Sequence, residues 1–100
     1  MFGELVAQLD RPEIAAGALV ALEDEELEST IRRYAGSNDL TVADCVAGLV
    51  RGFLDQADDE AWMQLVGIMA RATEDPSMAA FGAILRYCAK GFEAGTAQSP

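Results

Sequence analysis

The sequence contains no histidine, and this absence excludes several classes of enzyme. A chain without histidine cannot form a Ser-His-Asp or Cys-His nucleophile pair, and it cannot form a zinc site that needs an imidazole ligand. Histidine is also the most frequent general acid or base, so catalysis would have to rely on carboxylate, lysine or tyrosine side chains. We therefore expect a protein that is not an enzyme, and we assign it no catalytic residue.

Cysteine is nearly as scarce, since Cys45 and Cys88 are the only two. They are far apart and show no C-x-x-C spacing, so they predict neither a zinc site nor a disulfide framework. Both lie on inward helix faces, where buried thiols are inert and stay protonated. We expect two reduced thiols, as in a cytoplasmic protein, and neither a metal nor a cofactor.

Long hydrophobic runs are also missing, although 51% of the residues are hydrophobic. No apolar run approaches the roughly 18 residues of a membrane span. The N-terminus lacks a basic stretch followed by an apolar one, so it does not resemble a secretion signal. We expect a soluble protein that does not enter a membrane.

Basic residues are few, because seven Lys and Arg stand against 17 Asp and Glu, which gives a formal net charge of -10. Such a surface repels the phosphates of nucleic acids and of anionic membranes. We therefore expect no nucleic-acid partner and no membrane partner. A basic protein partner fits this charge, and solubility alone explains it as well.

Patterns typical of strands are absent, and nearly every segment shows helical spacing of its apolar residues. The chain has the size of one domain. We predict an all-α domain over residues 1–93, a compact bundle of five to six short helices stacked as antiparallel hairpins. A flexible tail is expected over residues 94–100. The helices are predicted over residues 2–9, 13–22 and 24–35, after Thr41, from Asp58, and after Asp75-Pro76.

The helical spacing also predicts which residues face the core. The segment 13–22 is apolar on most sides, which is typical of a central, buried helix. In the helix that begins near Asp58, the predicted inward residues are Trp62, Leu65, Val66, Met69 and Ala72. In the last helix they are Met78, Phe81, Ile84, Leu85, Cys88 and Phe92.

Two acidic clusters are the most conspicuous charged features of the sequence. Helix capping and favourable interaction with helix dipoles account for most of this charge. The functional alternative is a binding edge for a basic protein partner. Metal binding is disfavoured, because neither the EF-hand spacing nor a carboxylate-histidine motif is present. The candidate partner-binding residues are Glu23, Asp24, Glu25 and Glu26 in the first cluster, and Asp58, Asp59 and Glu60 in the second.

A weak similarity recurs at spacings of 31 and 34 residues, in the segments 17–20, 48–51 and 82–85. A repeated helical hairpin would have this period. Chance similarity among helices rich in alanine and glycine explains it equally well. A true repeat would place both acidic clusters at one end of the molecule, where they would form a single negative edge.

Gly48 and Gly52 are four residues apart, on one side of a predicted helix. Glycine inside a helix costs about 0.5–1 kcal/mol relative to alanine, and close approach of another helix can offset that cost. We expect this neighbour to come from the same chain, with a homodimer as the alternative.

These observations favour a small, acidic, non-enzymatic protein-protein interaction or regulatory module. The alternative is a small-molecule-binding helical domain with an apolar pocket lined by Trp62, Met69 and Phe81. Methionine and aromatic side chains suit such a pocket, although at helical spacing they are more often part of the core.

Overall fold

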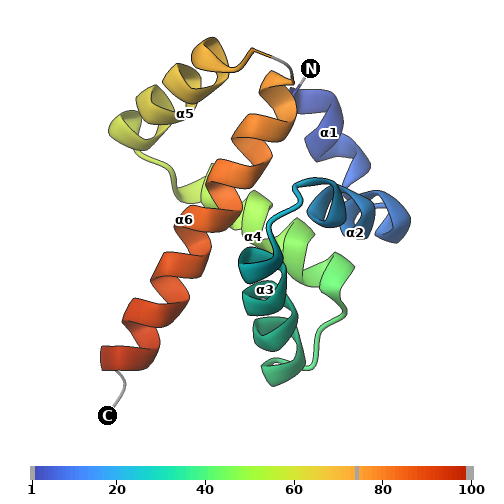
Figure 1. Cartoon of the computed structure of the whole chain (residues 1–100). Helices are drawn as coiled ribbons and strands as arrows, with labels where there is room; N and C mark the ends of the chain where they lie inside the picture. The colour runs from blue at the N-terminus through green and yellow to red at the C-terminus, as the bar shows by residue number, and fades with distance from the viewer. Residues whose placement is uncertain (1, 74, 99–100) are drawn as a thin grey trace.

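The computed structural model describes residues 2–73 and 75–98, with side chains described for residues 3–73 and 75–92. All regular structure within these residues is helical, which confirms the predicted all-α fold (Figure 1). The six helices are α1 (Phe2–Gln8), α2 (Pro12–Ala21), α3 (Glu25–Ser37), α4 (Val42–Gln56), α5 (Asp59–Arg71) and α6 (Pro76–Gln98). The predicted tail 94–100 overlaps the end of α6 and lies partly outside the described residues, so it stays a prediction.

Short polar side chains start four of the helices. The Asp24 carboxylate accepts a hydrogen bond from the Leu27 amide at the start of α3, 3.0 Å. Thr41 and Asp58 cap α4 and α5 in the same way, at 3.0 and 2.8 Å. Asp75 accepts from two amides at the start of α6. Each cap satisfies a backbone N–H that the first helical turn leaves without a partner.

The start of α2 and the end of α3 differ from simple sequence rules. Asp10 would be the expected cap of α2, but the N-cap position is Arg11, and Pro12 begins the helix without a side-chain cap. Gly36, where α3 is expected to end, is still helical. The left-handed backbone conformation falls instead on Asp39, with φ 56°, a conformation that aspartate tolerates better than most residues.

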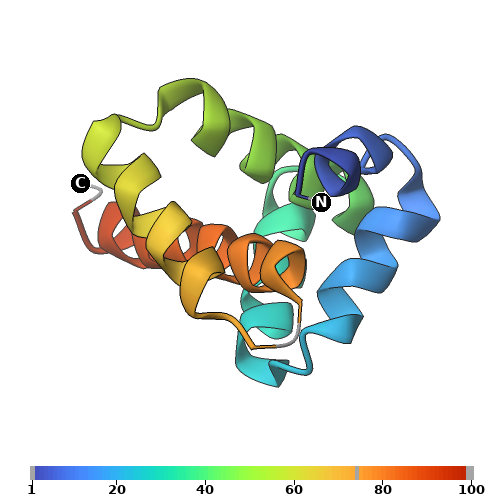
Figure 2. The ribbon, with the colours of Figure 1, turned by 90° about the horizontal axis from the view of Figure 1, so that it is seen from above.

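Helices α4 and α6 form the centre of the molecule. Helix α2 packs mainly against α4, while α5 packs mainly against α6, which also contacts α1, α3 and α4. Figures 1 and 2 show α5 and α6 side by side as an antiparallel hairpin, with α1, α2 and α3 on the other side of α6. The buried residues of the two central helices are Ala43, Cys45, Val46, Ala47 and Val50 on α4, and Ala80, Phe81, Ile84 and Leu85 on α6.

The prediction of a central α2 is wrong. Ala15, Ala18 and Leu19 are buried, but Val20 on the same helix is exposed. Helix α2 lies at the periphery, where it packs mainly against α4. Its apolar composition reflects its many alanines more than its position.

The inward face predicted for α5 is also partly wrong. Leu65 is buried, with 2% of its surface exposed, and Met69 packs against the core. Trp62 and Val66, however, are 39% and 55% exposed. Because α5 packs mainly against one neighbour, its buried side is narrower than that of a helix enclosed by several others.

Candidate functional site

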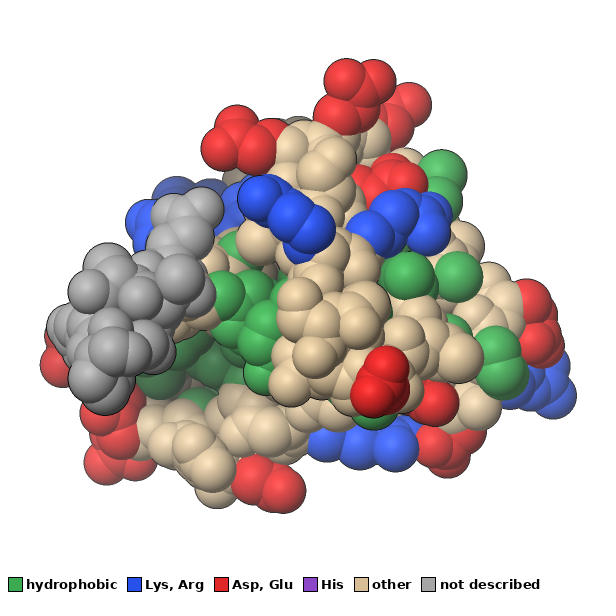
Figure 3. All heavy atoms as spheres, turned by 90° about the horizontal axis from the view of Figure 1, so that it is seen from below, with side chains coloured by type: hydrophobic (Ala, Val, Ile, Leu, Met, Phe, Trp, Pro, Cys, Tyr) green, Lys and Arg blue, Asp and Glu red, His purple; other side chains and the backbone are tan. Residues whose placement is uncertain are grey.

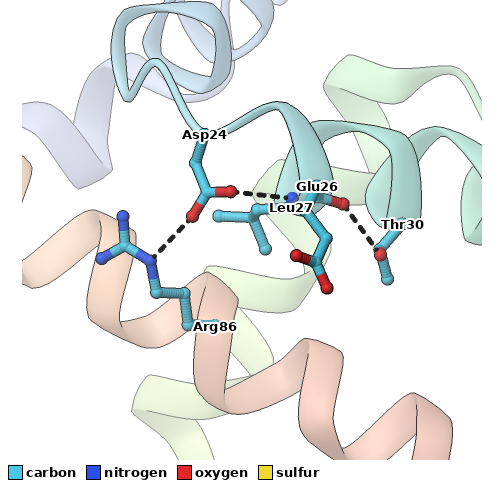
Figure 4. Close-up of polar contacts among 5 residues, drawn as sticks. All are labelled: Asp24, Glu26, Leu27, Thr30 and Arg86. Carbon is cyan, nitrogen blue, oxygen red and sulfur yellow. Dashed lines mark hydrogen bonds and ion pairs between the residues drawn. The ribbon is translucent and has the colours of Figure 1, made fainter.

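Asp24 of the first acidic cluster lies at the turn between α2 and α3, where its carboxylate accepts two hydrogen bonds (Figure 4). One of its carboxylate oxygens accepts from the Leu27 amide, and the other accepts from Arg86 Nε of α6 at 3.2 Å. The Leu27 hydrogen bond, and then Arg86, lower the pKa of Asp24 below its ordinary value. Asp24 therefore links two helices that are distant in sequence.

Glu28, a further acidic residue just after this cluster, forms a local ion pair, while the remaining carboxylates of the cluster are exposed. Glu28 pairs with Arg32 one turn further along α3, at 2.9 Å. Glu23, Glu25 and Glu26 are exposed. Helix capping and pairing with arginine account for Asp24 and Glu28, which leaves three carboxylates of the cluster facing solvent.

Replacing Asp24 with asparagine should lower the melting temperature, Tm, in a pH-dependent way. Asparagine can still cap α3, but it loses the charge interaction with Arg86. Because folding lowers the pKa of Asp24 from 3.8, its contribution is complete above that pH and is lost as the pH falls through the folded value. Thermal unfolding should show a higher Tm for the wild type than for Asp24→Asn at pH 7. This difference in Tm should shrink progressively as the pH falls below 3.8.

The control for this experiment is Glu25→Gln, which removes the same charge from the same helical turn. Glu25 has no ion pair with a described residue, so this variant should change Tm less than Asp24→Asn at pH 7. Equal effects of the two substitutions at every pH would show that the contact with Arg86 contributes nothing specific.

The second acidic cluster lies at the turn between α4 and α5. Asp58 caps α5, while Asp59 and Glu60 are exposed. Both ribbon views place this turn and the turn between α2 and α3 on different sides of α6 (Figures 1 and 2). The structure therefore does not bring the seven acidic candidates together into a single edge.

A hydrophobic groove runs beside the second cluster, between α4 and the α5–α6 hairpin. Its larger hollow has a volume of 330 Å³ and its smaller one 60 Å³, and both are lined by Phe53, Ala61 and Tyr87. We call this surface the α4–α6 groove. The other lining residues are Gly48, Leu49, Gly52, Gln56, Ala57, Asp58 and Cys88 in the larger hollow, and Gln64, Leu65, Ile68, Ala83 and Ile84 in the smaller. The molecular surface seen from below also shows a hollow with hydrophobic side chains at its floor (Figure 3).

An aromatic pair stands where the two hollows of the groove meet. The rings of Phe53 on α4 and Tyr87 on α6 are 5.5 Å apart and nearly perpendicular. This edge-to-face arrangement is favourable for aromatic rings. Tyr87 is nevertheless 64% exposed, so the groove offers a large aromatic surface to solvent.

The glycine pair of α4 does not have the role expected from the sequence. A methyl group added at Gly48 or at Gly52 would meet no described atom within 4 Å outside its own stretch of helix. No helix of the described chain packs closely against them, so the expected close neighbour is missing. Both glycines instead line the larger hollow of the groove, and the absence of their side chains widens it.

The two cysteines are free thiols. Cys45 is buried, whereas Cys88 is partly exposed and lines the groove, with its Sγ 3.9 Å from the Leu49 carbonyl oxygen. Burial raises the pKa of both thiols, and the proximity of Cys88 raises that of Cys45 further. Both therefore stay protonated at neutral pH, which makes them weak nucleophiles.

Among the described residues, Trp62, Met69 and Phe81 do not line a pocket together. Phe81 is completely buried and has no surface from which to line a pocket. Trp62 is exposed, and neither hollow of the groove is lined by it or by Met69. An apolar hollow lies instead between α4 and the α5–α6 hairpin. Its only signal in the sequence was the pair Gly48 and Gly52.

Comparison of the chain with models of protein families, with curated proteins and with solved structures found no match. In residues 2–73 and 75–98, no group of three or more potential ligands is arranged to hold a metal ion. No helix within the same residues has the length and apolar character needed to span a bilayer. The function therefore has to be inferred from the residues of this chain.

Proposed function

We propose that this protein is a small acidic interaction module that binds a segment of another protein in the α4–α6 groove. The observation that carries the proposal is the apolar hollow of 330 Å³ lined by Gly48 and Gly52. An anchor side chain from a partner can be buried there, and interfaces draw most of their binding energy from a few side chains of this kind.

The lining of the groove supports this function. Three helices and the short turn between α4 and α5 contribute to it, so its shape depends on the folded chain. Tyr87 and Phe53 provide aromatic surface, and tyrosine in particular is enriched where proteins bind one another. Asp58 at the margin of the larger hollow adds a polar group. An apolar centre with a polar rim is the usual organisation of an interface.

The glycines provide a second argument. Glycine within a helix is unfavourable compared with alanine by about 0.5–1 kcal/mol. At Gly48 and Gly52 a side chain has room, so the described part of the fold does not require glycine there. A partner that approaches α4 closely at these two positions would require glycine there, because a larger side chain would keep it away.

The test fills the hollow with a side chain of the protein itself. Gly52→Leu places a leucine in the larger hollow, where the first added carbon has free space. The wild type and Gly52→Leu are each used to capture proteins from cells that express this chain. At least one protein captured by the wild type should bind Gly52→Leu about tenfold or more weakly, which corresponds to about 1.4 kcal/mol. Quantitative mass spectrometry of the captured proteins gives the measurement.

The matched control is Gly17→Leu on α2. Gly17 is also a helical glycine with free space at its Cβ position, but it does not line the groove. This variant should retain the captured protein, and circular dichroism should show both variants folded. If every protein captured by the wild type is retained equally by Gly52→Leu, the groove is not the docking site.

A further inference from the structure

We infer that the occupant of the α4–α6 groove is a basic amphipathic helix. This inference rests on the proposed docking function and adds the chemistry of the partner. Charge, the fold and the small residues of the groove each contribute to it.

The charge around the groove is acidic. No Lys or Arg lines either hollow among the described residues, while Asp58 lines the larger one. Asp55 follows the lining residue Gly52 by three residues on α4, and Glu60 precedes the lining residue Gln64 by four on α5. Residues at these spacings are neighbours on the surface of a helix, so both carboxylates lie one helical turn from the lining of the groove. Both carboxylates are exposed, and neither forms an ion pair with a described residue.

Three arginines are paired with carboxylates that do not line the groove. Arg32 pairs with Glu28, Arg51 with Asp10, and Arg86 with Asp24. Lys90 follows Tyr87 by three residues on α6, so the rim holds one lysine against Asp55, Asp58 and Glu60 and keeps an acidic excess. It therefore complements lysine or arginine side chains from a partner, which would also speed its association. A second copy of this chain is a poor occupant, because it would bring the same net charge of -10.

The fold favours a helix over an extended strand as the occupant. The described residues contain no strand, so they offer no sheet edge to which an extended peptide could add. Recognition must come from side-chain packing, as when the apolar face of a helix lies in a groove. The small residues that line the groove are Gly48, Gly52, Ala57, Ala61 and Ala83. Small side chains let a second helix approach closely.

The experiment uses four synthetic peptides of 18 residues, each carrying a fluorescent label. The first places leucine at positions i, i+3, i+4 and i+7 with lysine elsewhere, so that it forms a basic amphipathic helix. The second and third replace every lysine with glutamine or with glutamate. The fourth is the first peptide with proline in place of one residue in each helical turn, so that it cannot be helical. Fluorescence anisotropy at low salt measures Kd.

The basic helix should bind the wild type about tenfold or more tightly than the glutamine peptide, and the glutamate peptide should bind more weakly than either. Gly52→Leu should weaken the basic helix about tenfold, whereas Gly17→Leu should not. Asp55→Asn with Glu60→Gln should weaken it severalfold. Glu25→Gln with Glu26→Gln, which changes the net charge equally at the other acidic cluster, should leave Kd within about twofold. Asp58 is not replaced, because it caps α5.

The outcomes separate this inference from the function on which it rests. If the glutamine peptide binds as tightly as the basic one, and Gly52→Leu weakens both, the partner is not basic and the docking function stands. If the proline peptide binds more tightly than the basic helix, the partner is not helical. If the basic helix fails to bind, or binds the wild type and Gly52→Leu equally, the inference is wrong. The docking function is then decided separately by the capture experiment.

Discussion

Phe81→Ala is expected to lower the free energy of unfolding by about 3–5 kcal/mol. Phe81 has no exposed surface and lies on α6, the helix that contacts α1, α3, α4 and α5. Its removal leaves a cavity where several helices meet, which the surrounding side chains can only partly fill. For a chain of this length, the loss corresponds to a fall in Tm of at least about 12 °C.

The control for Phe81→Ala is Met63→Ala on α5. Met63 is the most exposed of the large hydrophobic residues that are described, so its truncation should change the free energy of unfolding by less than about 0.5 kcal/mol. Chemical denaturation of both variants, with an unchanged dependence on denaturant, measures the difference. A loss below about 1 kcal/mol for Phe81→Ala would contradict the central position of α6.

Much of the fold was accessible from the sequence because helix formation depends on neighbouring residues. Asp24, Thr41 and Asp58 cap the helices that they precede, and a cap requires only a short polar side chain within three residues of an amide. Asp75 before Pro76 marks the start of α6 in the same way. The starts of these four helices were therefore predictable without knowledge of their packing.

The candidate site was harder to predict because it depends on how helices meet. The sequence drew attention to Gly48 and Gly52 but not to the absence of a neighbour against them. Tyr87 and Phe53 are 34 residues apart, and nothing local to either indicates that their rings meet. The acidic residues were visible as clusters, yet only the structure shows Asp24 joined to Arg86 and Asp58 beside a hollow.

The groove also explains how one helix combines a structural side with a side for binding. Val46 and Val50 of α4 are completely buried, whereas Gly48 and Gly52 on another side of the same helix line the groove. Stability and proposed binding thus depend on different residues of α4. Substitutions of the two glycines should therefore alter partner binding without removing buried side chains.

The exposure of α5 leads to the second large effect, a contrast between two adjacent residues. Leu65→Ala should lower the free energy of unfolding by about 2–5 kcal/mol, because Leu65 is buried against α6 and the cavity cost adds to the lost apolar contact. Val66→Ala should change it by less than about 0.5 kcal/mol, because that side chain is mostly exposed. Sequence spacing alone predicts both residues to be inward and would give both substitutions a large effect.

Urea denaturation of the two variants beside the wild type measures this contrast, and it also tests the orientation of α5 on α6. Helix α5 touches mainly one other helix, so its stability depends strongly on the few side chains that face α6. A large loss for Val66→Ala would mean that the exposed side of α5 is covered in solution. Equal small losses for both would mean that α5 contributes little to the folded domain, and the wall that it gives to the α4–α6 groove would then be lost as well.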